Sequence, residues 1–598
     1  MLLLSLAGCS STANNQAAAG ADAGGSGGSN YWNQEENSAA SDAVTGTNTN
    51  VSVDYSDFDV LETWDGNACT IELNGGGASV SGIGASVSNG NGFCMVEITQ
   101  GGTYVISGTL ENGQIYVAAG ENQVHLVLNG AAVTCKTSAP IYVNNGKKTV
   151  ITLADGTENS LTDGAQYAYA ITETEDETGE VTGEPNAVLF SKKALTINGG
   201  GALSVTGNFN NGITCKDDLK IMNGTITVTA KNHGIRGNDS VAVKSGTIRI
   251  TAAEGDGMKS TKKETAEKGY VYVENAAISI EAGDDGIQAA TLLAVLDGTI
   301  SIACAKDGFH SDGDISVSGA AVSIAAGDDG MHADGTLTVL GGAIEISESY
   351  EGLEALVINI AGGTIHLKAS DDGLNASSGG SSAGTNDGRG PGGGFGGGMQ
   401  YESACQINIT GGSVYVDAEG DGIDSNGDLT ISGGCVIING PTGNGDGALD
   451  TNGTILVTGG FLVAAGSSGM AETPEGTSTQ NVIVTTFPQQ QQAGSIVRIV
   501  DAAGNDLLTF SPSKTYSSVL FSSPDLKNGT EYTVYTGGSY SDGIVRDGLM
   551  AGGSYAGGTS FGSVTVSAIL SYIGTAGSGI GGGGGFGGGV NRGGRPGR

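Results

Sequence analysis

The chain contains 598 residues, more than an ordinary single domain unless the fold grows by repetition. Its 25 Lys and Arg residues are outnumbered by 63 Asp and Glu residues, which gives a formal net charge of −38. This charge repels phosphates, so it argues against nucleic acid as a partner and favours divalent cations or cation-bridged anionic polymers. The 107 Gly residues and an aromatic content of 5% are typical of short strands around a narrow core. A disordered acidic chain is the alternative, and the regular apolar pattern described below argues against it.

Residues 1–9 are similar to the end of a bacterial lipoprotein signal. Leu6-Ala7-Gly8-Cys9 resembles a lipobox, in which Cys9 becomes the acylated first residue of the mature protein. The alternative is a short apolar segment with an ordinary cysteine. No later stretch reaches the roughly 18–20 continuous apolar residues that span a bilayer. We therefore expect a protein of the cell envelope that faces the outside and contacts the membrane only through its lipid anchor.

The other cysteines are scattered and form no CxxC pair, which argues against a zinc ribbon or a redox motif. Export would permit disulfides, and a bond between Cys69 and Cys94 is one pairing that stays open. An odd number leaves at least one cysteine unpaired, and we expect most of them to be small apolar core residues. The seven are Cys69, Cys94, Cys135, Cys215, Cys304, Cys405 and Cys435.

The chain then divides by composition. Residues 10–50 are rich in Ala, Gly, Ser and Asn, which predicts a flexible tether. Residues 51–190 contain short Val- and Ile-rich segments such as Val124–Leu128, which predict an N-terminal β region with the first coils of a repeat.

Residues 191–475 repeat a step in which an acid is followed by Gly and an apolar residue. Most gaps between these glycines are 21–23 residues. A longer gap before Gly286 contains the charged insert Lys262–Lys268, and the 49-residue gap before Gly422 contains a glycine-rich insert near 377–400. The glycines are Gly212, Gly234, Gly257, Gly286, Gly308, Gly330, Gly352, Gly373, Gly422, Gly447 and Gly469.

This period predicts an all-β fold, a right-handed parallel β-helix (a solenoid) with about 22 residues per coil. Leucine-rich repeats can share the period, but their Leu/Asn pattern is missing and no repeat has room for a helix. Stacked coils would place neighbouring strands about 4.8 Å apart. Residues 480–572 leave the period and predict a small antiparallel β module that caps the open end, and the Gly/Arg tail 576–598 is expected to be disordered.

The residue before the repeated Gly is a carboxylate in eight successive repeats. The residue after the Gly is apolar and should point inward, so the Gly must break the strand alternation and place the acid at a turn. Some repeats add a second acid one residue earlier, and the outward position two residues after the Gly adds further oxygen ligands. The eight acids are Asp256, Asp285, Asp307, Asp329, Glu351, Asp372, Asp421 and Asp446; the second acids are Asp284, Asp328 and Asp371; the outward acids are Glu354, Asp424 and, in the longer Gly447 repeat, Asp450.

Stacking should line these acids up in a column. Two unscreened charges 4.8 Å apart repel by roughly 3.5 kcal/mol at an effective dielectric constant near 20. Either some acids hold protons or cations lie between the coils, and calcium is favoured because it takes six to eight oxygens in irregular shells. The alternative is that Asp-Gly only makes good turns, although Asn would serve there without repulsion. His310 and His332 share the outward position, and turn or surface roles are favoured for them over metal ligation.

Four segments resemble a family of bacterial surface proteins known as carbohydrate-binding-domain-containing proteins: Glu254–Thr261, Ala282–Ile287, Ala326–Gly335 and Ser349–Ala355. The resemblance covers about 60–470. It implies a right-handed parallel β-helix similar to calcium-dependent pectate lyases, which binds plant cell-wall polysaccharides such as cellulose and polygalacturonate without established lyase activity. It also implies calcium ligation by Asp256, Asp284, Asp285, Asp307, Asp328, Asp329, Glu351, Asp371, Asp372 and Asp421.

Three functions remain in competition. The favoured one is a monomeric surface module that binds calcium and polysaccharide, because calcium can bridge to sugar carboxylates; few rings beyond Tyr350 and Tyr415 look exposed, which counts against it. A polysaccharide lyase would need calcium and a base, and Lys259 and Lys306 are the only basic side chains in the acidic column. A structural adhesin is the third.

Overall fold

A computed structural model describes residues 51–168, 172–175, 181–263, 265, 267–378 and 401–574. Cys9, the tether 10–50, the tail 576–598 and residues 379–400 of the glycine-rich insert lie outside the described residues. Every regular element in the described ranges is a β-strand, which confirms the all-β prediction. Within these ranges no helix is long and apolar enough to cross a membrane.

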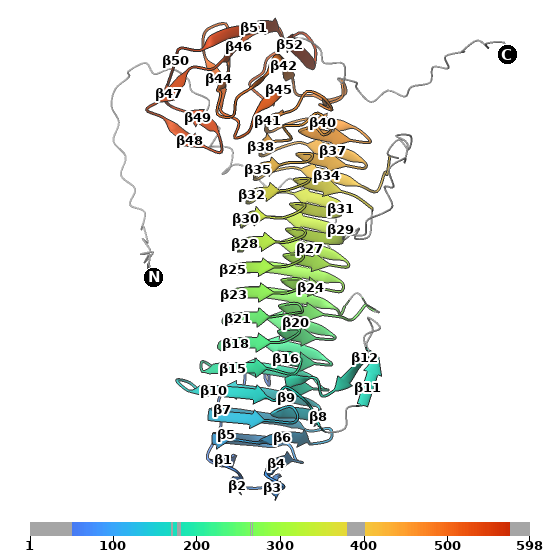
Figure 1. Cartoon of the computed structure of the whole chain (residues 1–598), viewed down its shortest axis with the longest axis vertical. Helices are drawn as coiled ribbons and strands as arrows, with labels where there is room; N and C mark the ends of the chain where they lie inside the picture. The colour runs from blue at the N-terminus through green and yellow to red at the C-terminus, as the bar shows by residue number, and fades with distance from the viewer. Residues whose placement is uncertain are drawn as a thin grey trace, which may run out of the picture.

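In the repeats, each strand pairs in parallel with the equivalent strand of the next layer, where a layer is one passage of the chain through three rows of strands (Figure 1). Ile213 lies opposite Ile235, and Ile235 opposite Met258. The apolar residues after the repeated glycines thus stack in the predicted register as far as Ile423, which lies opposite Leu374.

The first row, which we call the site row, contains β4 (Phe93–Ile98), β6 (Gly113–Ala118), β8 (Ile141–Asn145), β13 (Ala187–Ser191), β16 (Asn211–Cys215), β19 (Ile235–Gly237), β22 (Met258–Ser260), β24 (Ile287–Ala289), β26 (Phe309–Ser311), β29 (Met331–Val339), β31 (Leu353–Ile360), β33 (Leu374–Ala376), β36 (Ile423–Ser425) and β39 (Leu449–Thr451). The second row contains β9 (Lys148–Leu153), β14 (Leu195–Asn198), β17 (Asp218–Ile221), β20 (Ser240–Val243), β23 (Tyr270–Ala282), β25 (Leu292–Cys304), β27 (Asp314–Val317), β34 (Gln406–Ile409), β37 (Asp428–Ile431) and β40 (Ile455–Val457). The third row contains β10 (Glu158–Asp163), β15 (Ala202–Gly207), β18 (Thr225–Ala230), β21 (Thr247–Ala252), β28 (Ala321–Ala326), β30 (Ala343–Glu348), β32 (Thr364–Ala369), β35 (Ser413–Ala418), β38 (Cys435–Asn439) and β41 (Phe461–Gly466).

The three rows belong to one sheet of 42 strands, and this corrects the predicted fold class. The 13-residue strands β23 and β25 continue from the second row into the third, and β29 and β31 continue from the site row into the second. The sheet therefore closes around its core as the sheet of a barrel does, and the prediction of an open right-handed parallel β-helix was wrong. The repeat determines which strands stack, but not whether strands of adjacent rows are continuous.

The ends of this sheet are antiparallel rather than parallel. At the N-terminal end β1 (Cys69–Gly75) pairs with β2 (Ala78–Ser81), and β3 (Ala85–Gly90) pairs with β4; β5 (Gly102–Leu110) and β7 (Gln123–Cys135) follow in parallel. At the other end β45 (Tyr516–Ser522) pairs antiparallel with both β41 and β42 (Val482–Gln491), and β52 (Leu570–Gly574) joins β42 in parallel. These strands cover the terminal layers, where an exposed edge would favour association.

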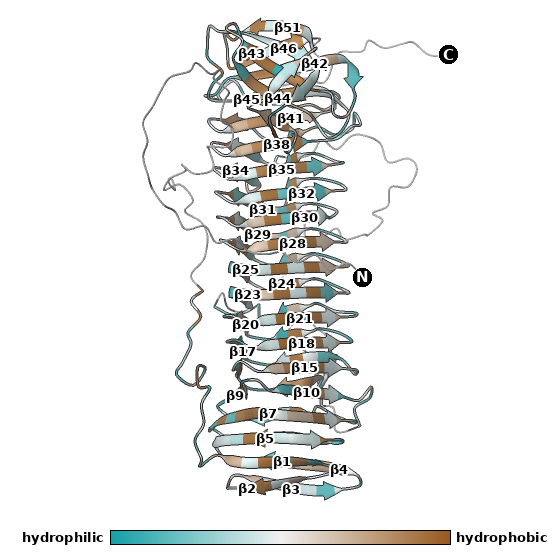
Figure 2. Cartoon of the chain, turned by 90° about the vertical axis from the view of Figure 1, so that its left-hand side faces the viewer, coloured by the Kyte–Doolittle hydropathy of each residue, from teal (hydrophilic) through white to brown (hydrophobic). Residues whose placement is uncertain are grey.

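The inner faces of all three rows form one apolar core. The residues after the repeated glycines are fully buried from Ile213 to Ile423, as predicted, whereas Met470 is 46% exposed and lies outside the repeat. Along third-row strands such as β18, buried Ile and Val alternate with outward Thr, which gives the alternating colours in Figure 2. Each fully buried Ile, Leu or Val contributes about 1.5–3 kcal/mol. Cys69 and Cys94 are free thiols and are not bonded to each other here.

The remaining strands of residues 480–572 form a separate unit at the C-terminal end (Figure 1). Its core continues from the outer faces of β38 and β41 and encloses part of Tyr415, so this ring is not the exposed platform that the sequence indicated. A six-stranded sheet contains β43 (Val497–Asp501), β44 (Asp506–Phe510), β46 (Glu531–Thr536), β48 (Ile544–Arg546), β49 (Leu549–Ala551) and β51 (Thr559–Thr565), and β47 (Ser539–Ser541) pairs antiparallel with β50 (Ser554–Ala556). Outside this unit, β11 (Thr172–Glu175) and β12 (Val181–Glu184) form a small antiparallel pair between β10 and β13.

Residues 51–65, which we call the strap, contain no strand and lie along the outside of the second row (Figure 2). Asp59, a residue of the strap, is fully buried and forms ion pairs with Lys148 and, at 3.6 Å, with Lys220. Burial acts to raise the pKa of Asp59, but the hydrogen bonds from Lys148 and Thr196 outweigh it and hold that pKa well below its usual range. This buried pair fixes the strap to the layers.

We expect Asp59→Asn to lower the free energy of unfolding by about 3–5 kcal/mol, because it leaves two lysines without their buried partner. Since the folded pKa of Asp59 is depressed, its contribution is present above pH 3.8 and is lost in stronger acid, where the variant and the parent should converge. Urea titration at several pH values measures this, with the exposed Asp57→Asn as the matched control. Equal midpoints for Asp59→Asn and the parent at pH 7 would contradict it.

Candidate metal-binding column

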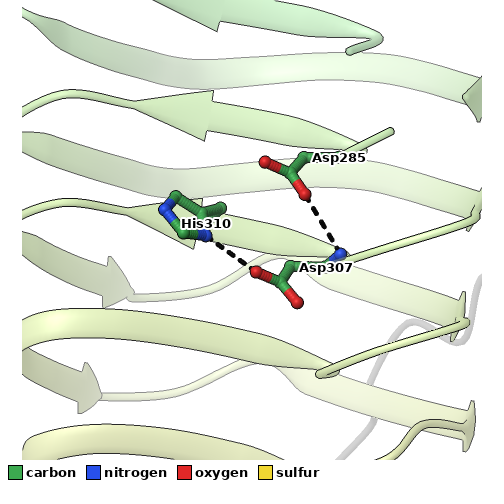
Figure 3. Close-up of side chains that lie close together, drawn as sticks. All are labelled: Asp285, Asp307 and His310. Carbon is green, nitrogen blue, oxygen red and sulfur yellow. Dashed lines mark hydrogen bonds and ion pairs between the residues drawn. The ribbon is translucent and has the colours of Figure 1, made fainter. Parts of the chain in front are cut away.

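Successive acids before the repeated glycines are joined by backbone hydrogen bonds. The N–H of Asp307 donates to Asp285 Oδ1 at 3.2 Å, and the N–H of Asp329 donates to Asp307 Oδ1 at 3.0 Å (Figure 3). The same bond joins Asp285 to Asp256 and Glu351 to Asp329. We call these residues the acid column; its members are Asp256, Asp285, Asp307, Asp329, Glu351, Asp372 and Asp421.

The repeated glycine fixes the position of each acid because the layers approach closely there. A Cβ atom on Gly286 would lie 2.5 Å from the carbonyl oxygen of Gly308 and 2.5 Å from Ile302 Cγ2. The same distances recur at Gly308. The Gly is therefore required by the spacing between layers.

Two side chains without a carboxylate occupy the same position in earlier layers. Asn211 Oδ1 accepts the N–H of His233 at 3.2 Å, and His233 Nδ1 accepts the N–H of Asp256 at 3.0 Å. The turn thus needs a hydrogen-bond acceptor but not a carboxylate. This weakens the alternative in which Asp-Gly serves the turn alone, because the carboxylates supply a charge that the backbone does not require.

A second row of side chains, which we call the outer row, stands two residues after each Gly and changes sign along the layers. Its N-terminal members are cationic, its middle members are Gln and His, and its C-terminal members are mainly acidic. In pairing order they are Arg236, Lys259, Gln288, His310, His332, Glu354, Asn375, Asp424 and Asp450.

The cations of the outer row pair with the N-terminal half of the acid column. Lys259 Nζ lies 2.8 Å from Asp256 Oδ2, and His310 Nδ1 lies 2.7 Å from Asp307 Oδ2 (Figure 3). His332 Nδ1 lies 3.2 Å from Asp329 and 2.6 Å from Glu354.

Both histidines carry a proton in this arrangement. Burial acts to lower their pKa values, but hydrogen bonds to the carboxylates outweigh it and raise the pKa of His310 to about 10 and that of His332 to about 11. A protonated imidazole has no lone pair for a metal. The two rings therefore act as cations that offset part of the negative charge of the acid groups Asp285–Asp307–His310 and Asp329–His332–Glu354, where the sequence suggested calcium.

The C-terminal half of the acid column lacks such cations. The carboxylates of Asp372, Asp421 and Asp424 offer oxygens that all lie within 4.8 Å of one another. Among the residues that the structure describes, no Lys, Arg or His forms an ion pair with any of the three. Burial, together with neighbouring carboxylates, raises the pKa of Asp372 to about 7, that of Asp421 to about 8 and that of Asp424 to about 7.

Acids that flank this group have the same environment. Burial and the charge of Glu354 raise the pKa of Glu351 to about 9. Asp450 lies opposite Asp424, as the sequence predicted for the longer repeat. Glu472 was missed, because it follows no acid-Gly step; it accepts the N–H of Thr451 at 3.0 Å, and burial with the charge of Asp450 raises its pKa to about 7.

Asp446 lies outside the column, which differs from its predicted place. The N–H that donates to Asp421 Oδ1 belongs to Gly447, and Leu449 lies opposite Ile423. The turn before Gly447 is longer than in other layers, so alignment on the Gly shifts the register by one residue. Of the second acids, Asp328 joins Asp307 and Asp329 in one group, Asp284 pairs with Lys306, and Asp371 accepts a hydrogen bond from Tyr350.

Neither candidate base for a lyase is free. Lys306 Nζ lies 2.6 Å from Asp284 Oδ1, and this hydrogen bond raises the pKa of Lys306. Lys259 is paired with the fully buried Asp256. A general base must be unprotonated to accept a proton, so neither contact favours catalysis.

Part of this chain is similar in sequence to known proteins. The family model of the carbohydrate-binding domain-containing protein matches residues 94–352. A carbohydrate-binding domain-containing protein of Acetivibrio thermocellus is 45% identical over 201 residues, which are 33% of this chain and 67% of that protein. The chain therefore belongs to the carbohydrate-binding domain-containing family.

A solved structure, titled as that of the polysaccharide lyase-like protein from C. thermocellum in a gadolinium derivative, is 36% identical to this chain. It matches 42% of this chain and 97% of its own, with a TM-score of 0.39. The residues matched by the family model end at Gly352, before Asp372, Asp421 and Asp424.

We expect the ring protons of His310 and His332 to show no titration between pH 5.5 and 8 by NMR, because both imidazoles stay protonated in their ion pairs. His125 should stay neutral over the same range, since burial lowers its pKa to about 4. His310→Gln and His332→Gln assign the signals. A midpoint near 6.5 for either ring would contradict the ion pairing.

Proposed function

We propose that this protein binds polysaccharide and that calcium, held by Asp372, Asp421 and Asp424, forms part of the binding surface. The family supports a polysaccharide as the partner. The observation that carries the calcium proposal is the group of three close carboxylates with no cationic partner in the described residues. The proposal does not include the N-terminal half of the acid column, where Lys259, His310 and His332 supply part of the counter-charge.

The donor set suits calcium. It contains only carboxylate oxygens, which are hard ligands, and the three lie within 4.8 Å of one another. Zinc and copper favour nitrogen or sulfur, and magnesium gives up its water with difficulty. Three carboxylates fill part of a shell of six to eight oxygens, which leaves positions for water or for a ligand.

A bound calcium ion would locally offset the net charge of −38, which repels acidic polymers. Calcium that keeps open positions can bind the carboxylates of a uronate polymer such as polygalacturonate. Tyr350 is 49% exposed beside Asp371 and adds an aromatic surface next to the column.

Placement on the cell surface is a further part of the proposal. It depends on acylation of Cys9, whose sequence context resembles a lipobox. The strap begins at Val51 near Leu292, so a tether from Cys9 would join the layers partway along their length.

We expect the purified protein to contain calcium and to bind polygalacturonate in a manner that EGTA abolishes. Asp421→Asn and the double variant Asp372→Asn/Asp424→Asn should weaken calcium and polygalacturonate binding on the order of tenfold or more, because each removes ligand charge. Elemental analysis and calorimetry measure the two effects. Asp57→Asn is the matched control, since this exposed acid belongs to the strap and not to the layers. A metal-free protein with an unchanged melting temperature after EGTA treatment would contradict the proposal.

The stability of the metal-free protein should depend on pH in a defined direction. With folded pKa values raised to about 7 for Asp424 and about 8 for Asp421, the folded state holds protons that the unfolded chain, near 3.8, releases. The free energy of unfolding contributed by these groups therefore falls as pH rises from about 4 to about 8.

Calcium takes the place of those protons. Its stabilising effect should therefore be larger at pH 8 than at pH 5, and its binding should release protons at pH 7. Differential scanning calorimetry with calcium or EGTA, and titration in weak buffer, measure both. An equal calcium effect at the two pH values, with no proton release, would argue against these ligands.

A further inference from the structure

A depression of about 360 Å³ lies far from the acid column, between the strap and the turn after β9. Glu62 and Trp64 line it from the strap, and Thr152, Asp155 and Gly199 line it from the layers. Trp64 is 40% exposed and is the only tryptophan in the described residues. An indole that faces an open depression is an unusual surface in a chain with 5% aromatic residues.

The backbone that carries Trp64 is held by hydrogen bonds to the layers. Asn198 Nδ2 donates to the carbonyl oxygen of Leu61 at 2.9 Å, and the Thr152 hydroxyl donates to Asn198 Oδ1 at 2.6 Å. His125 Nε2 lies 2.7 Å from the Thr152 hydroxyl and extends this network. The strap is therefore fixed directly before Glu62, so the depression is preorganised rather than formed by a loose terminus.

The floor of the depression depends on a close approach of backbone. Gly199 has a φ of +91°, and a Cβ atom there would lie 2.3 Å from the carbonyl oxygen of Leu153. Only Gly is compatible with both constraints.

Two carboxylates stand at the rim with one oxygen of each engaged. Glu62 Oε1 accepts a hydrogen bond from Asn223 Nδ2 at 2.8 Å, and Asp155 Oδ1 accepts the N–H of Gly200 at 3.1 Å. These bonds orient the carboxylates. Their second oxygens form no hydrogen bond within the described residues and remain available as acceptors.

We propose that this depression binds a neutral pyranose unit of a polysaccharide. The flat apolar face of Trp64 matches the C–H face of a pyranose ring, and the free oxygens of Glu62 and Asp155 accept hydrogen bonds from its hydroxyl groups. A uronate is disfavoured, because two carboxylates repel it and no Lys or Arg lines the depression. This inference rests on the proposed polysaccharide binding but not on calcium.

The depression and the calcium group form separate sites. The depression lies in the layer of β14, and Asp372 precedes β33, about eight layers further along, which corresponds to roughly 40 Å. One site has an aromatic face with hydroxyl acceptors, and the other has carboxylates for a cation. They would therefore select neutral and acidic sugars independently.

Titration of the full chain with cellohexaose, xylohexaose and mannohexaose tests the proposal. In a Trp32→Phe background Trp64 is the only tryptophan, so its fluorescence should change with at least one of these neutral sugars, in calcium and in EGTA alike. Measured by calorimetry, Trp64→Ala should weaken that binding about tenfold or more, and Trp64→Tyr should retain part of it. Glu62→Gln and Asp155→Asn should each weaken it less than Trp64→Ala.

The controls separate this inference from the proposed function. Trp64→Ala should leave the melting temperature and polygalacturonate binding in calcium unchanged, and Asp421→Asn should leave neutral-sugar binding unchanged. Failure of all three sugars to bind, or equal binding by Trp64→Ala and the parent, would overturn the inference. A loss of polygalacturonate binding in Trp64→Ala would overturn the separation of the sites. If Asp421→Asn binds polygalacturonate normally, the calcium proposal fails while this one stands.

Discussion

The stacking of one layer on the next controls the chemistry of this protein. Backbone hydrogen bonds hold the layers at a fixed spacing, and most acids of the column accept the N–H of the acid in the next layer. The carboxylates cannot separate without breaking this ladder, so their mutual repulsion of roughly 3.5 kcal/mol per neighbouring pair has to be offset locally. Protons, cationic side chains and metal ions are the available means, and the sequence of the outer row decides which one acts in each layer.

The change of charge along the outer row divides the column into two parts that differ in the source of their counterions. Where Lys259, His310 and His332 face the acids, the fold carries counterions of its own. Where Asp424 and Asp450 stand in that row, charge accumulates and a divalent cation becomes the most effective counterion. The family match ends at Gly352, so the part that favours calcium is set by residues outside the matched range.

The repeat made much of this site predictable. A period near 22 and the inward residue after each Gly gave the correct register from Ile213 to Ile423, and with it the stacking of the acids. Three features could not be predicted from the repeat. The first is the continuity of β23 and β25 from one row into the next, which closes the sheet, and the second is the longer turn that places Asp446 outside the column. The third is the ion pairs of the histidines, because they depend on side-chain conformation and not on the spacing of residues in the sequence.

The strap lies outside the repeat and can therefore carry a side chain that the repeated layers do not provide. A layer can place the same residue type again and again, which suits a column of carboxylates. At the turn that forms the floor of the depression the layers approach too closely for a side chain, as the contacts around Gly199 indicate. The strap crosses the layers from outside, so it can carry Trp64 without that constraint. Its anchor, the buried Asp59 with Lys148 and Lys220, then serves recognition as well as stability, because it determines where the indole stands relative to Asp155.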